Sequence, residues 1–192
     1  VLIKNFFTKY KNMAYLFKSG KMASNVLDSA LSNAKLEVAV KDGSLIVLGD
    51  LVADDTYRST GGYEYDTYSA AAPGENELAD AIIDLADIQM GVIGGNEYKM
   101  GVKLYDLQAP AGYICRARRL ALHDKFWLGE GNFGSAPTVG TTMVAIAGGK
   151  SIKVIADRDL TVGNRSFAKV SGYEKMYLCE VVETPAEDSN ED

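Results

Sequence analysis

The run from Gly129 to Gly134 is the part of the sequence whose residue types and spacing come nearest to a cofactor-binding motif. It reads Gly-Glu-Gly-Asn-Phe-Gly and matches the Gly-x-Gly-x-x-Gly pattern of loops that bind phosphate groups. Such a loop needs a helix directly after the glycines, because the helix N-terminus faces the phosphates. Residues 135–138 read Ser-Ala-Pro-Thr and do not predict a helix. We therefore expect glycine-rich turns with positive φ angles, and no nucleotide site.

His123 is the single histidine in 192 residues, which excludes most catalytic and metal sites that depend on histidine. A serine or cysteine nucleophile needs such a base close by, whereas His123 lies beside Asp124 and Lys125 in an expected turn. The carboxylates follow no calcium-loop pattern and are expected to form a solvated surface. We expect no catalytic residue, no cofactor and no metal, so the chain is predicted not to be an enzyme.

Arg116, Arg118 and Arg119 form the densest basic group of the sequence. On a strand, Arg116 and Arg118 share one face, while Cys115 and Ala117 share the other. Two interpretations stay open. The arginines can protect an exposed sheet edge from aggregation, or they can bind the carboxylates of another protein through paired hydrogen bonds.

Aromatic residues supply the other candidates for binding. Trp127 fits a core position, an interface or a platform for a sugar ring. Tyr63 and Tyr65 belong to a group of tyrosines set among Gly, Asp and Ser, which predicts that they are exposed. Our candidate protein-interface residues are therefore Arg116, Arg118, Arg119, Trp127, Tyr63 and Tyr65.

The elements that must position these residues are mostly strands. A short helix is expected over 23–33, followed by a hairpin that turns at Asp42-Gly43. Strands are expected over 63–67, 113–122, 125–128, 141–147, 151–156, 165–170 and 175–183. The segment 77–89 fits a helix or a buried strand, and the strand is preferred. Short strands about ten residues apart, separated by glycine-rich turns, predict a mainly β fold. We expect an antiparallel sandwich or barrel with a short N-terminal helix and extended terminal arms.

The two ends of the chain carry opposite charge. Residues 1–21 hold five lysines and no acidic residue, whereas 183–192 are rich in Asp and Glu. Apolar residues near a 3.5-residue spacing predict a basic amphipathic helix at the start, which can dock on a partner, pack on its own domain or lie on a membrane surface. We divide the chain into an N-terminal arm (1–22), a β-rich core domain (23–183) and an acidic tail (184–192).

Bulk properties limit the partners. The net charge of −6 argues against nucleic acid, which needs clustered Lys and Arg. No apolar run is long enough to span a membrane. Cys115 and Cys179 lack the spacing of a zinc site or a disulfide framework, which is typical of folding in a reducing cytoplasm.

Several short segments also carry a resemblance to a known class of proteins. The segments are 45–52, Asn96-Glu97-Tyr98, 109–120, 124–127, 131–133 and 175–182. Across 36–183 the chain resembles small capsid-associated, head decoration-like virion structural proteins of tailed bacteriophages.

The resemblance implies a mostly β protein without enzymatic activity that binds the major capsid protein and decorates or stabilises the head. It also implies self-association or symmetric lattice contacts, synthesis in the host cytoplasm and a final location on the capsid surface of the virion. The alternative is a tail or fibre component, or a glycan-binding module of the virion.

Overall fold

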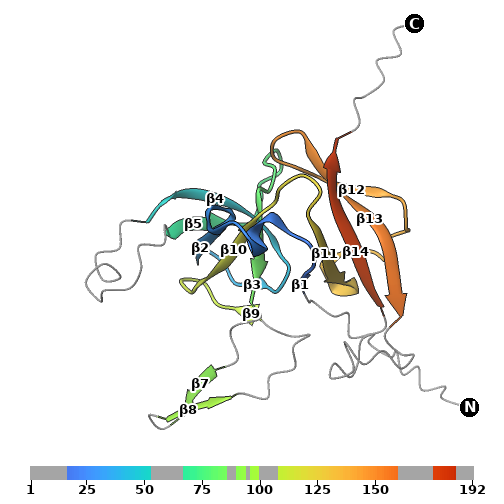
Figure 1. Ribbon diagram of the computed structural model, residues 1–192. Coiled ribbons are helices and arrows are strands. Elements are labelled where there is room, and N and C mark those ends of the chain that lie inside the picture. The colour runs from blue at the N-terminus through green and yellow to red at the C-terminus, as the bar shows by residue number, and fades with distance from the viewer. Residues whose placement is uncertain are drawn as a thin grey trace, which may run out of the picture.

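Short strands, most of them antiparallel, make up the fold (Figure 1). The structure is a computed structural model, and it describes residues 17–52, 67–85, 90–93, 96–99, 108–159 and 175–184. The strands are β1 (Phe17–Ser19), β2 (Leu31–Leu36), β3 (Val40–Lys41), β4 (Leu45–Leu51), β5 (Thr67–Ala71), β6 (Ala81–Asp84), β7 (Met90–Ile93), β8 (Asn96–Lys99), β9 (Gln108–Ala109), β10 (Ile114–Arg119), β11 (Lys125–Gly129), β12 (Thr142–Ile146), β13 (Lys150–Asp159) and β14 (Lys175–Glu183). The expected mainly β, antiparallel fold is confirmed.

Five strands close into a small barrel in the order β10-β2-β5-β4-β6. Every pair in the barrel is antiparallel except β2 and β5, which run parallel. Small side chains such as Ala34, Ala70 and Ala117 belong to its core, because a barrel of so few strands leaves little interior space. β3 and β9 form a separate pair, as do β7 and β8.

The second layer is a five-stranded antiparallel sheet in the order β1-β11-β14-β13-β12. Its inner face carries Phe126, Val154 and Tyr177, all nearly inaccessible to solvent. Ile82 of β6 and Leu120, which follows β10, belong to the same apolar cluster. The outside of the barrel therefore covers the inner face of the sheet, and the main core lies between the two layers (Figure 1).

The helix expected over 23–33 is wrong. Two single 3-10 turns, Ala23–Asn25 and Asp28–Ala30, take its place, and β2 begins at Leu31. Val26 and Leu27, which would lie on the apolar face of such a helix, are exposed. From Leu31 the burial alternates with a period of two, because every second side chain of β2 points into the barrel.

The turn at Asp42-Gly43 is present, and Gly43 has a φ of 76°. It does not close a hairpin, however, because β4 pairs with β5 and β6, and β3 pairs with β9. The side chain of Asp42 points inward and accepts backbone hydrogen bonds from Phe17 of β1 and from Leu85, which follows β6. The ambiguous segment 77–89 contains β6.

The N-terminal boundary of the folded core lies earlier than the expected arm of 1–22. Strand β1 (Phe17–Ser19) pairs with β11. The fold also buries the side chains of Phe17 and Met22. Residues 1–16 lie outside the described residues, as do most of the expected acidic tail 184–192 and the strand expected over 165–170. In the part of the chain that the structure describes, no helix is long and apolar enough to cross a membrane.

Candidate protein-binding face

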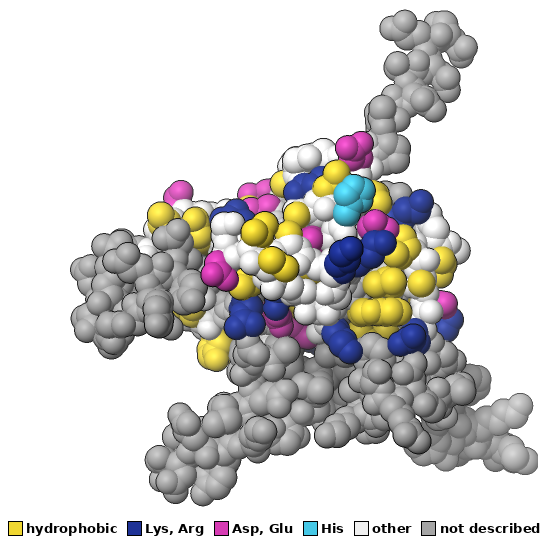
Figure 2. Space-filling view, in the orientation of Figure 1, with side chains coloured by type: hydrophobic (Ala, Val, Ile, Leu, Met, Phe, Trp, Pro, Cys, Tyr) yellow, Lys and Arg dark blue, Asp and Glu magenta, His cyan; other side chains and the backbone are white. Residues whose placement is uncertain are grey.

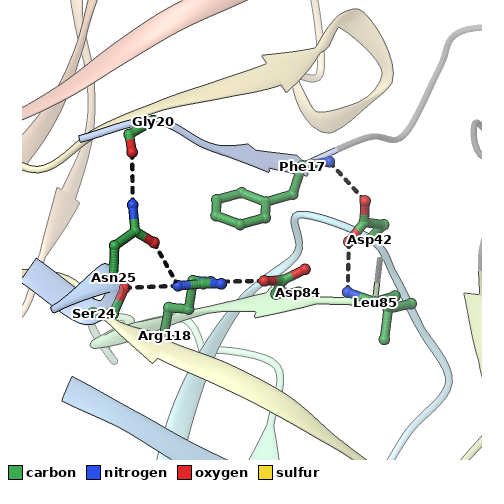
Figure 3. A network of polar contacts seen from close by, with 8 residues as sticks. All are labelled: Phe17, Gly20, Ser24, Asn25, Asp42, Asp84, Leu85 and Arg118. Carbon is green, nitrogen blue, oxygen red and sulfur yellow. Dashed lines mark hydrogen bonds and ion pairs between the residues drawn. The ribbon is translucent and has the colours of Figure 1, made fainter. Parts of the chain in front are cut away.

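Arg118 is buried inside the protein and is not an interface residue of the folded monomer. Its Nε donates to Asp84 Oδ2 at 2.7 Å, and its Nη1 donates to Ser24 Oγ at 3.1 Å and Asn25 Oδ1 at 3.0 Å (Figure 3). Its guanidinium also lies 6.0 Å from the ring centre of Phe17. Arg118 thus joins the barrel to the N-terminal turns and to the core of the second layer.

The interpretation of the three arginines as guards of a sheet edge is wrong. β10 lies between β2 and β6 in the closed barrel, so it has no open edge. Arg116 is exposed. Arg119 lies 3.5 Å from Asp80 and 5.0 Å from the ring centre of Tyr68. Because Arg116 and Arg119 project from opposite faces of β10, the three arginines do not form one contact surface.

Trp127 lies on the outer face of the five-stranded sheet, where it is half-buried. Its neighbours Phe126 and Leu128 point into the core. The strand register places Lys18, Trp127, Leu178 and Ala156 in one row across four strands. Side chains in such a row stand about 5 Å apart, so Trp127, Leu178 and Ala156 form an apolar strip that solvent reaches.

Basic side chains surround this strip. Arg158 lies 5.5 Å from the ring centre of Trp127, and Lys18 is exposed at the β1 end of the row. The neighbouring row contains Lys125, Glu180 and Lys153. Figure 2 shows hydrophobic side chains gathered over the five-stranded sheet with Lys and Arg around them. We define the Trp127 face by its apolar and charged members: Trp127, Leu178, Ala156, Lys18, Lys125, Lys153, Arg158 and Glu180.

The Trp127 face is positive although the chain has a net charge of −6. Four cationic residues of the face stand against the single carboxylate of Glu180, which lies 3.5 Å from Lys125 and 3.6 Å from His123. Local surplus charge of this kind steers and selects an oppositely charged partner. The face is suited to an acidic protein surface that also offers apolar side chains.

Among the residues described, no group of three or more His, Cys, Asp or Glu side chains is placed to hold a metal ion. His123 lies in an exposed turn at a φ of 67°. The neighbouring Asp124 is buried, and its carboxylate accepts backbone hydrogen bonds from Ala23 at 2.7 Å and Ala121 at 2.9 Å. The carboxylate of Asp124 therefore holds the turn in place.

The glycine-rich run ends β11 and forms the 3-10 turn Glu130–Asn132. The expected turn is therefore present, but the expected reason for its glycines is wrong, since none of them has a positive φ. Gly129 and Gly131 are instead buried positions. No helix opens after Gly134 to receive a phosphate.

The expectation that the carboxylates form a solvated surface is wrong for Asp42, Asp84, Asp124 and Glu130, which are buried. Asp42 was missed because an Asp-Gly pair is usually an exposed turn. One carboxylate oxygen accepts the amide of Phe17 at 2.7 Å and the other accepts the amide of Leu85 at 2.8 Å (Figure 3). Burial raises the pKa of Asp42 to about 7, and the charge of Asp84 raises it further, against the opposing effect of these hydrogen bonds.

Both cysteines are buried in different clusters, Cys115 in the barrel and Cys179 between the layers. Burial raises the pKa of each thiol to about 12, and the charges of Asp84 and Asp42 add to the effect at Cys115. Because the thiolate is the reactive form, we expect neither to react with a chromogenic disulfide reagent at pH 8 and both to react in denaturant. Rapid labelling of the native protein would contradict this placement.

The remaining predicted site residues, Tyr63 and Tyr65, lie outside the described residues. Sequence reasoning identified Trp127 but missed its neighbours. The alternation over 175–183 could have predicted that Leu178 lies on the outer face. Arg158 and Lys153 could not have been predicted as neighbours of Trp127, because only the pairing of β13 with β14 brings them close to it. Comparison of the chain with models of protein families, with curated proteins and with solved structures finds no match.

Proposed function

We propose that this chain is a structural protein of a tailed-bacteriophage virion that binds the major capsid protein and decorates or stabilises the head. The observation that carries this proposal is the Trp127 face, an apolar strip with a positive rim on an acidic protein. Aromatic residues and arginine are the side chains most enriched where proteins bind each other. In this account the chain has no catalytic role and needs no cofactor.

The geometry of the face fits a partner that is repeated many times. Binding through a sheet face needs no deep pocket, and each copy of the chain can use it against an equivalent site of a symmetric shell. The cations at its rim would bind acidic side chains of the capsid subunit, and Trp127 and Leu178 would exclude water from the centre. Further contacts between neighbouring copies belong to the same proposal.

A glycan-binding module of a tail or fibre is the less favoured alternative. A sugar ring stacks on an open aromatic face, but the guanidinium of Arg158 lies over the ring of Trp127 at 5.5 Å. The surplus of lysine around the ring also favours an acidic partner over a neutral sugar.

Replacing Trp127 with glutamate is expected to weaken binding to purified capsids by about 30-fold or more, the effect of losing a central interface residue. The measurement is co-sedimentation of purified chain with capsids that lack it. Tyr113→Glu is the matched control, because Tyr113 is also an exposed aromatic residue but precedes β10 on the barrel.

The double substitution Lys18→Glu with Arg158→Glu gives a second test that leaves the core untouched, because both side chains are exposed. It should weaken binding in the same assay, and most strongly at low salt. Unchanged binding by both this variant and Trp127→Glu, with circular dichroism spectra like those of the wild type, would refute the proposed role of the face.

A further inference from the structure

An apolar cleft of about 410 Å³ opens between the barrel and the five-stranded sheet. Its walls include Val40 and Leu45 from the barrel side and Phe133 and Ile152 from the sheet side. Val38 and Val144, which also line it, remain 46% and 40% exposed. Exposed apolar side chains grouped at a concave site are typical of a surface that binds another apolar segment.

The cleft is suited to apolar side chains. Lys41 is the one charged residue among those that line it, and Ser44 and Asn132 are the main uncharged polar ones. The side-chain amide of Asn132 already donates to the backbone oxygen of Asp42 at 2.7 Å. Few polar groups are therefore left to recognise a polar ligand, and the volume suits one or two aromatic side chains.

The N-terminal segment 1–16 joins the fold directly beside this cleft. Phe17 pairs with Leu128, which lines the cleft, and the amide of Phe17 donates to Asp42, whose neighbours Lys41 and Gly43 also line it. Because β1 runs antiparallel to β11, its first residue, Phe17, lies at the end where β11 passes into the turn Glu130–Asn132. Phe133, at that same end, is part of the cleft wall.

The composition of segment 1–16 matches the cleft. It contains Ile3, Phe6, Phe7 and Tyr10 at the spacing of one helix face, and no acidic residue. Phe17 follows Phe7 by ten positions, a span of about 15 Å as a helix or about 33 Å when extended. Either span is long enough for Phe6 and Phe7 to reach the cleft, because its lining includes Leu128, the residue that pairs with Phe17.

We propose that segment 1–16 docks in this cleft of its own chain and places Phe6 and Phe7 between Val38 and Val144. A short connection gives the segment a millimolar effective concentration at the cleft, which favours the same chain over a second copy. The contact is of the helix-in-groove kind, in which apolar residues three and four apart enter a hydrophobic groove. The docking uses no residue of the Trp127 face, so its test does not depend on the proposed function.

Photo-cross-linking in the full chain tests this docking. A benzophenone amino acid replaces Phe7, and the free protein is irradiated at low micromolar concentration and digested for mass spectrometry. The expected product is a cross-link within one chain to residues 38–45 or 144–152, in a band of monomer mass. The same probe in place of Lys9, on the polar side of the segment, should give little of this product.

A variant of the cleft provides the second arm of the experiment. Val144→Asp is expected to lower the yield of the cross-link by about tenfold, because the docked ring would meet a carboxylate in place of an apolar wall. Val139→Asp, another exposed valine outside the cleft, is the matched control. Cross-links mainly between two chains, or mainly to residues outside the cleft, would overturn the proposal, as would a yield unchanged by Val144→Asp.

Discussion

Replacing Arg118 with alanine is expected to lower the free energy of unfolding by about 3–5 kcal/mol, the cost of leaving a buried charge without its partner. Asp84, which accepts from the Arg118 Nε at 2.7 Å, is itself buried. The substitution also removes the donors that Ser24 and Asn25 use, and these residues shape the first 3-10 turn. Chemical denaturation followed by circular dichroism measures the change.

Arg116→Ala is the matched control for this prediction, because Arg116 lies two residues away on the same strand and is exposed. It should change the free energy of unfolding by no more than about 0.5 kcal/mol. Replacing the pair together, with Arg118→Met and Asp84→Leu, should restore most of the lost stability, since neither member of the pair is then left buried without the other. A loss below about 1 kcal/mol for Arg118→Ala alone would show that the ion pair is not buried as described.

Raising the pH from 5 to 8 is expected to destabilise the fold through Asp42. Its pKa rises from 3.8 in the unfolded chain to about 7 in the fold, so the folded state binds the proton more tightly. The folded protein is therefore favoured at low pH and loses this advantage as the pH rises from about 4 to 7. At 1.36 kcal/mol per unit, the whole contribution is about 4 kcal/mol, of which about 2–3 kcal/mol falls between pH 5 and 8.

Comparison of Asp42→Asn with the wild type isolates this contribution. The amide stays neutral at every pH, so the variant should lack the Asp42 part of the pH dependence, although it retains only one acceptor for the amides of Phe17 and Leu85. Asp50→Asn, at an exposed position on β4, serves as the control. Urea unfolding at pH 5 and pH 8 gives the change in the free energy of unfolding between the two pH values. An equal change for Asp42→Asn and the wild type would contradict the pKa assigned to Asp42.

Strand patterns predicted the class of fold because burial alternates along them. Residues 175–183 and 125–128 were identified as strands in this way, and both lie in the five-stranded sheet. The segment 23–33 was misread because Val26 and Leu27 fit a helix face as well as a loop. What decides between them is the contact of Arg118 with Ser24 and Asn25, which are more than 90 residues away in sequence.

The candidate site was predictable only in part, for a related reason. Trp127 was identified from its residue type, but its position on the outer face follows from the direction of Phe126 and Leu128. Arg158 reaches the ring from a different strand, beyond an irregularity in the pairing between Val154 and Ala156. A shift of one residue in register moves every later side chain to the other face of the sheet, so the sequence alone cannot place Arg158.

Asp42 and Arg118 show how the two layers depend on each other. Asp42 accepts the amide of Phe17 from the sheet and the amide of Leu85 from the end of β6, while Arg118 holds Asp84 on the same strand (Figure 3). The two carboxylates also interact, since the charge of Asp84 raises the pKa of Asp42. This buried network fixes the sheet against the barrel and so supports the Trp127 face from beneath.

Cryo-electron microscopy of purified virions shows whether this chain binds the capsid through the Trp127 face. We expect density for this fold at regular positions of the capsid lattice, with the five-stranded sheet facing the major capsid protein and Trp127 at the centre of the contact. Density on the tail, a particle that lacks the chain, or a capsid contact made by the barrel while Trp127 faces solvent would contradict the account.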